Sequence, residues 1–149
     1  MTASISNIGR LVEILNSLNK FIKNYAIYIY VIDTNYRIIW ANNYTRDKFH
    51  ISRLSKKNTC HHLLWKFNRR CDDCPVGQVM GGKQVQRYVL QRSFTHASEN
   101  VFIEIISMPV LDSRGDIEGL LLLGVDVTPL EKKQRELRQK EKLFLSIVD

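Results

Sequence analysis

Apolar positions along the chain change their spacing twice, and these changes divide it into three parts. From Ser4 to about Asn24 the apolar residues recur every three or four positions, which predicts an amphipathic helix. Its wide apolar stripe requires burial, either on the following domain or against a second copy of the chain. The stripe consists of Ile5, Ile8, Leu11, Val12, Ile14, Leu15, Leu18, Phe21 and Ile22.

From Tyr25 onward the sequence predicts β-strands. Residues 26–32 are rich in β-branched and aromatic side chains, which suit a pleated sheet, and Asp33-Thr34-Asn35 is typical of a turn. A second strand directly after this turn gives a hairpin. The expected strands cover residues 26–32, 37–41, 84–94, 100–110 and 117–125.

Residues 44–83 interrupt the strands with polar, basic sequence that lacks alternation, which indicates short helices and loops. Gly81-Gly82 is expected to stop the last of these helices. The predicted fold class is therefore α+β: a five-stranded antiparallel sheet with short helices on one face, flanked by N- and C-terminal amphipathic helices.

The last helix has a well-marked start. Thr128-Pro129-Leu130-Glu131 has the pattern of a capping box, in which the Thr hydroxyl accepts a hydrogen bond from the Glu131 N–H. Asp126 precedes it at a distance from which its carboxylate can reach the positive end of the helix. Glu131 and Arg135 form a favourable i,i+4 pair, and Leu130, Leu137 and Phe144 repeat every seven residues, as in one seam of a coiled coil.

Taken together, these features resemble a PAS sensor domain over roughly residues 20–130. The opening hairpin ends in Asn42, and the turn Asp112 to Gly115 precedes a last strand that contains Gly119. Gly124-Val125-Asp126-Val127-Thr128 is similar to the D-x-T junction from which PAS domains pass to a signalling helix. The chain differs where many PAS domains close the first hairpin with a glycine: Asn35-Tyr36 stands there, and Asn tolerates left-handed geometry.

The resemblance implies a sensory or signal-relay module of a larger signalling protein, such as a sensor histidine kinase. Such a module binds a small ligand or cofactor, or senses redox state, and passes the signal through a dimeric C-terminal helix. Residues 1–24 would form the N-terminal helix, 25–128 the PAS-like domain, and 129–149 the start of a signalling helix with an output domain beyond it.

Asp126 and Thr128 would couple the sheet to that helix, and a parallel homodimer through the terminal helices is expected. The sequence contains no catalytic motif, so this part of the protein is not expected to be an enzyme. The full-length protein would be the histidine kinase or another signalling enzyme.

A cluster of cysteines is the main candidate for chemistry. Cys60, Cys71 and Cys74 lie within fifteen residues, and His61 and His62 adjoin the first of them. Three thiolates and one imidazole would complete a zinc site, and an iron–sulfur cluster would also need a fourth ligand. Cys71 and Cys74 alone could close a disulfide as a redox switch, and three reduced cysteines that only pack are the fourth alternative. Haem on either histidine and a flavin on Cys60 rank below these.

Composition and charge narrow the class of protein. The chain has 149 residues, 44% hydrophobic and 25% charged, which excludes wholesale disorder. No apolar run is long enough to span a membrane, no signal peptide is present, and the number of cysteines is odd, so a cytoplasmic location is expected.

Residues 46–70 contain eight Lys or Arg and one acid, which accounts for the whole net charge of +7. A patch of this kind attracts anions, although most such patches are solvated faces. The alternative function is therefore a small metal- or nucleic-acid-binding domain that uses the basic, Cys-rich segment 46–75, with nucleic acid ranked below the other partners.

Overall fold

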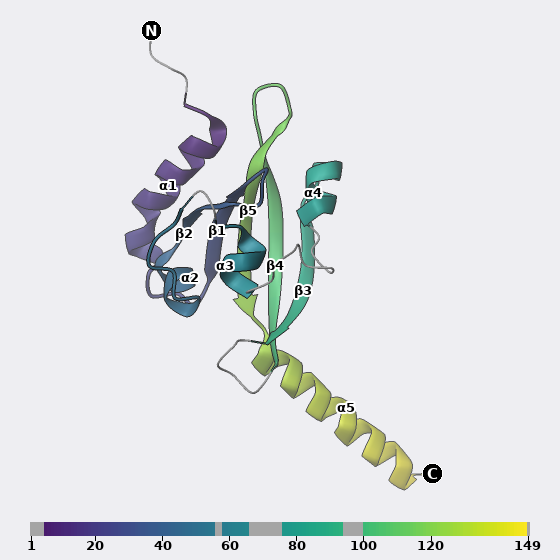
Figure 1. Ribbon diagram of the computed structural model, residues 1–149. Helices are drawn as coiled ribbons and strands as arrows, with labels where there is room; N and C mark the ends of the chain where they lie inside the picture. Colours follow the sequence, from purple (N-terminus) through teal and green to yellow (C-terminus); the bar gives the residue numbers. More distant parts are fainter. Residues whose placement is uncertain (1–4, 56–57, 66–75, 94–99, 149) are drawn as a thin grey trace.

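A five-stranded antiparallel sheet forms the centre of the protein (Figure 1). The structure, a computed structural model, describes residues 5–55, 58–65, 76–93 and 100–148. The strand order is β2-β1-β5-β4-β3, and every neighbouring pair is antiparallel, so the predicted fold class is confirmed. The strands are β1 (Tyr28–Asp33), β2 (Ile38–Ala41), β3 (Gln86–Ser93), β4 (Asn100–Leu111) and β5 (Ile117–Asp126).

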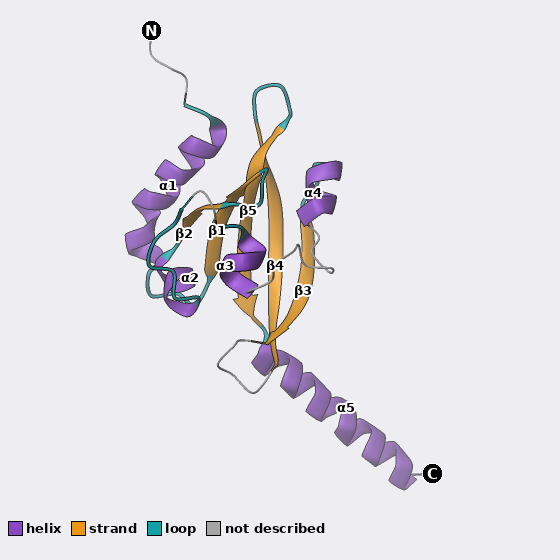
Figure 2. Cartoon of the chain, viewed as in Figure 1, coloured by secondary structure: helices purple, strands orange, loops and turns teal. Residues whose placement is uncertain are grey.

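Helices cover both faces of this sheet (Figure 2). Three short helices, α2 (Asn43–Lys48), α3 (Cys60–Trp65) and α4 (Val76–Gly82), pack on the face that carries Tyr28, Tyr30 and Ile32. The long α1 (Asn7–Ile22) packs on the opposite face against Ile29, Val31 and Trp40. The run of four leucines in β5 serves both layers, because successive side chains of a strand point to opposite faces. Leu120 and Leu122 face the short helices, and Leu121 and Leu123 face α1.

Polar contacts hold α1 on the sheet. The amide of Asn7 donates to the carbonyl of Leu111 (2.7 Å), the N–H of Ile8 donates to Glu118 (2.8 Å), and the Trp40 indole donates to Asn16 (2.7 Å). Because α1 packs on the sheet along one side only, part of its apolar stripe is buried and part is exposed. Leu15 is buried on the sheet, whereas Ile14, Leu18 and Phe21 are 55%, 45% and 65% exposed.

The hairpin between β1 and β2 closes in a way that the sequence did not predict. The left-handed residue is Tyr36 (φ 66°), not Asn35, and the side chain of Tyr36 is buried. The carboxylate of Asp33 organises the turn by accepting the backbone N–H groups of Asn35 (2.8 Å) and Arg37 (3.0 Å). The end of α4 also differs from the expectation that Gly81-Gly82 stop the helix. Gly81 and Gly82 lie inside the helix, and Lys83 (φ 56°) is the left-handed residue that ends it.

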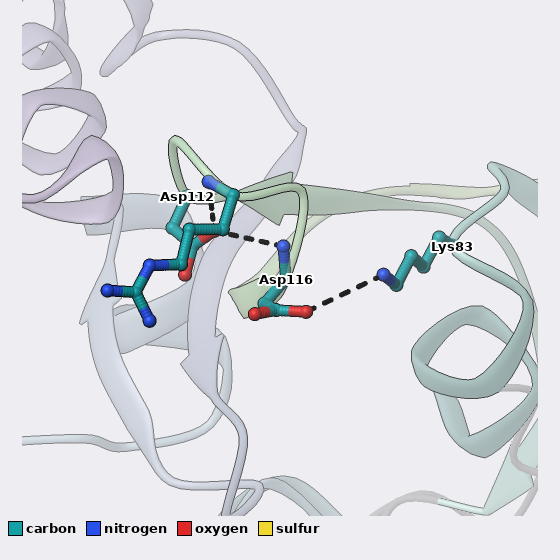
Figure 3. Close-up of polar contacts among 4 residues, drawn as sticks. Lys83, Asp112 and Asp116 are labelled. Atoms are coloured by element: carbon teal, nitrogen blue, oxygen red, sulfur yellow. Dashed lines mark hydrogen bonds and ion pairs between the residues drawn. The ribbon is translucent and has the colours of Figure 1, made fainter.

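The turn between β4 and β5 is organised by Asp112 (Figure 3). Its carboxylate accepts the backbone N–H groups of Asp116 (2.9 Å) and Arg114 (2.8 Å), and Gly115 supplies the positive φ of 83°. These N–H groups, that of Asp116 first, hold the pKa of the Asp112 carboxyl below its usual range. The ammonium of Lys83 lies 3.8 Å from Asp116 and so connects the end of α4 to this turn.

The last helix, α5 (Thr128–Val148), leaves the end of β5 and extends away from the sheet (Figure 1). None of its described residues is buried. Among the helices that the structure describes, neither α5 nor any other is long and apolar enough to cross a membrane.

Candidate functional site

The junction between β5 and α5 is the place where the sheet passes into the helix. The last residue pair between β4 and β5 is Ile103 opposite Asp126. One step further, the backbone N–H of Val127 still donates to the carbonyl of Phe102 on β4 (2.8 Å). The carbonyl of Val127, however, accepts the N–H of Glu131 (2.9 Å) and is therefore the first acceptor of the helix.

The hydroxyl of Thr128 takes over the position that this carbonyl leaves. In a continuing antiparallel ladder the N–H of Phe102 would donate to the carbonyl of Val127. It donates instead to Oγ1 of Thr128 (2.9 Å). The side chain of Thr128 thus keeps the ladder satisfied while the main chain turns into the helix.

This arrangement corrects the expected capping box. Val127, not Thr128, is the residue that caps α5, and the Thr128 hydroxyl bonds to β4 rather than to the Glu131 N–H. The expected bond does not form because the Thr128 hydroxyl instead accepts the N–H of Phe102, which would otherwise lack a partner in the ladder. The carboxylate of Asp126 does reach the helix start, since it accepts the N–H of Thr128 at 2.9 Å.

Phe102 is the residue of this site that the sequence analysis missed. It binds both Val127 and Thr128 through its backbone, and its ring lies under the guanidinium of Arg135 at 5.1 Å. Glu131 and Arg135 both lie in the described part of the chain but do not form the expected ion pair, because the guanidinium of Arg135 lies over the ring of Phe102 instead. Counting the hairpin register outward from the turn at 112–116 would have placed Phe102 opposite Asp126, one residue from its actual partner, because a register shift between Val110 and Leu111 moves the pairing by one residue.

The cysteine cluster lies only partly in the described chain. Cys60 is the first residue of α3; its side chain is buried in the core, and its N–H donates to the carbonyl of Tyr36 (2.7 Å). His61 is half-buried, with Nε2 at 3.1 Å from the hydroxyl of Thr59, and His62 is exposed. Cys71 and Cys74 lie outside the described residues.

Zinc, an iron–sulfur cluster, a disulfide switch and simple packing therefore all remain predictions for Cys60, Cys71 and Cys74. Within the described ranges no three His, Cys, Asp or Glu side chains are grouped as metal ligands would be. Of the eight basic residues in 46–70, the structure describes Arg46, Lys48 and Arg53. Arg46 donates to the carbonyl of Ala41 (3.2 Å), and the ammonium of Lys48 lies 5.6 Å from the ring centre of Tyr44.

The face of the sheet beneath α2, α3 and α4 is rich in tyrosine. The hydroxyl of Tyr88 on β3 lies 2.8 Å from that of Ser107 on β4, and Ser107 is fully buried. Tyr28 on β1 packs edge-on against Tyr44 of α2. Burial, and then the neighbouring Tyr44, raise the pKa of Tyr28 well above its usual value, so its phenol stays protonated. This face thus presents neutral hydroxyl groups in an apolar setting.

A family model described as the PAS fold matches residues 23–132. This range covers most of the chain and contains the whole sheet. The chain belongs to the PAS family. The matched range ends within α5 and so contains the junction described above. No protein among those of curated function matches the chain.

Solved structures agree on the PAS fold. An RNA-binding light-oxygen-voltage receptor has a TM-score of 0.65 at 14% identity, over 98% of this chain and 42% of that one. The PAS domain of BvgS from Bordetella pertussis has a TM-score of 0.52 at 16% identity, over 85% and 98%. A sensory box sensor histidine kinase from Vibrio cholerae has 0.56 at 15% identity, over 81% and 97%. The chain thus spans less than half of the receptor, and at these identities the likeness shows the fold alone.

Proposed function

We propose that this PAS domain is the sensory and signal-relay module of a larger signalling protein, a sensor histidine kinase, and that it acts on its output through α5. PAS domains are sensory modules that do not themselves catalyse reactions, and the family membership of the chain supports this class. One of its similar structures is a sensory box sensor histidine kinase, which supports the finer assignment.

The observation that carries the proposal is the hydrogen bond from the Phe102 N–H to the Thr128 hydroxyl. It makes the start of α5 part of the β4–β5 ladder, so a displacement of β4 changes the position of the first helical residue. The Asp126 carboxylate ties the same residue to β5 through its N–H. Signal coupling by Asp126 and Thr128 therefore has a direct physical route.

The input would act on the tyrosine-rich face, where a small ligand or cofactor would meet Tyr28, Tyr88 and Ser107. Redox or metal chemistry at Cys60, Cys71 and Cys74 is the second kind of input, because α3 places Cys60 in the core on this same face. Reduced thiols suit the cytoplasmic location that we propose for the module.

A parallel homodimer through the terminal helices would give the output its geometry. The exposed residues Ile14, Leu18 and Phe21 of α1 follow helical spacing on one face, and α5 exposes Leu130 and Leu137. The alternative of a nucleic-acid-binding domain has less support, because two of the three described basic residues in 46–70 contact the domain itself.

The test compares Thr128→Val with Thr128→Ser in the full-length protein, with autophosphorylation as the output. Valine has the shape of threonine but removes the acceptor for the Phe102 N–H, whereas serine keeps it. We expect Thr128→Val to change basal autophosphorylation by about threefold or more and Thr128→Ser to keep the wild-type rate. Asp126→Asn, which keeps an acceptor oxygen, is the matched control for Asp126→Ala.

Circular dichroism of each variant establishes that the domain is folded before its output is compared. A wild-type rate in folded Thr128→Val and Asp126→Ala would contradict the relay. A full-length protein without autophosphorylation would contradict the kinase assignment and leave the relay to be measured on its actual output.

A further inference from the structure

The direction of α5 is not set by packing of the helix. None of its described residues is buried, and Leu130, Leu137 and Phe144 are 57%, 54% and 65% exposed. A helix that buries no apolar face gains little from its surroundings and is marginal by itself. A few contacts near its start must therefore determine where it points.

Three of these contacts are made by Phe102. Its carbonyl accepts the N–H of Val127 (2.8 Å), and its N–H donates to the Thr128 hydroxyl (2.9 Å). Its ring lies under the guanidinium of Arg135, with 5.1 Å between Cζ and the ring centre. One residue of β4 thus contacts the helix start through its backbone and a later turn of the helix through its side chain.

The two kinds of contact have different consequences. The backbone pair fixes the position of the first helical residue but leaves the helix free to tilt about it. Arg135 follows Thr128 by seven residues, which is about two turns and roughly 10 Å along the axis. A second point of attachment at that distance removes the tilt and so defines the direction.

The charges around Arg135 favour the ring as its partner. Glu104 is two residues from Phe102 on the same face of β4, but its carboxylate is engaged by Arg87. Arg stacks on aromatic faces more readily than Lys because its guanidinium is planar and weakly hydrated. Arg135 therefore has a preferred place on the sheet.

We propose that Phe102 and Arg135 are the positioning residues that orient α5 relative to the sheet. This inference deepens the proposed function, because it names the side chains that turn a displacement of β4 into a change of helix direction. Neither residue senses anything itself; each acts through the geometry of α5. Breaking the contact would release the helix to a range of directions without unfolding the domain.

The experiment measures the direction of α5 in the 149-residue chain. Spin labels carried by noncanonical amino acids replace Thr34, in the exposed turn between β1 and β2, and Lys142 of α5, so the native cysteines stay in place. Pulsed electron resonance gives the distribution of distances between the two labels. Dilution with unlabelled protein removes distances between different molecules.

We expect a narrow distribution for the wild type and for Arg138→Gln, the matched control, which neutralises an exposed arginine one turn further along α5. Arg135→Gln should broaden the distribution and reduce the ratio of oriented to released helix by about two- to fivefold. Arg135→Lys should restore part of the narrow component, and Phe102→Leu should act like Arg135→Gln. The melting temperature of Arg135→Gln should equal that of the wild type.

Equal distributions for Arg135→Gln and the wild type would overturn the inference. Equal broadening in Arg138→Gln would overturn it too, because charge alone would then be responsible. Since Arg135 is on the surface, its variant remains informative even if Phe102→Leu fails to fold. The measurement needs no output domain, so its failure is distinct from a failure of the Thr128 test.

Discussion

Gly119 is the position where the structure tolerates a side chain least. It lies in β5 opposite Asp33 of β1, on the part of the sheet that α1 covers. A Cβ atom there would lie closer than 3.0 Å both to the carbonyl oxygen of Ile32 and to Cδ1 of Ile8. The Ile8 side chain can rotate away, but the Ile32 carbonyl is part of the central β1–β5 ladder and cannot move without breaking it.

Gly119→Ala should therefore lower the free energy of unfolding. Overpacking of this kind costs about 3 kcal/mol when the neighbour is rigid. Loss of the conformational freedom of glycine in the unfolded chain offsets up to about 1 kcal/mol of this. The net loss is about 2 kcal/mol, which corresponds to a melting temperature lower by roughly 4–8 °C for a chain of this size.

Gly81→Ala is the matched control. Gly81 lies within α4, and a Cβ atom there would meet nothing within 4 Å. Ala favours a helix over Gly by about 1 kcal/mol, so this variant should melt roughly 2–4 °C higher. Thermal unfolding followed by circular dichroism measures both. The reasoning is refuted if Gly119→Ala melts within about 1 °C of the wild type or if both variants shift in the same direction.

Two further predictions concern the dimer and pH. The double variant Leu18→Glu, Phe21→Glu should sediment as a monomer at micromolar concentration, where the wild type should sediment as a dimer. Val85→Glu, the control, should remain a dimer. A double variant that is still a dimer would show that α1 is not part of the dimer interface. Tyr28 has a raised pKa in the folded state, so its contribution to stability is complete below the unfolded pKa of about 10 and is lost as pH rises above it. In urea unfolding, the free energy of unfolding of Tyr28→Phe should fall less than that of the wild type between about pH 9 and 11. Tyr25→Phe, a change at an exposed position, should show the same fall as the wild type.

Local pattern determined the elements and the family of this protein. The apolar spacing of residues 4–24, the β-branched runs and the turn residues predicted α1 and all five strands to within a few residues. These signals depend on near neighbours in the chain, which is why they can be recognised without a structure. The ending Asp126-Val127-Thr128 was recognised in the same way.

Only the tertiary structure decided which atoms these residues bind. Thr128 was expected to bond within its own helix, but the unpaired N–H of Phe102, 26 positions away in sequence, takes its hydroxyl. Arg135 was expected to pair with Glu131, but the ring of Phe102 lies within its reach. At the first hairpin the left-handed residue is Tyr36 rather than Asn35, and the side chain of Tyr36 is buried in the core.

The division of the α1 stripe into a buried and an exposed side has the same origin. Sequence periodicity identifies the apolar positions of α1, whereas the docking contacts to Leu111, Glu118 and Trp40 select the side that faces the sheet. Each of these outcomes depends on strand register and on groups that are distant in sequence. Local propensity is too weak to specify such partners, because the energies that choose between them arise only when the sheet is assembled.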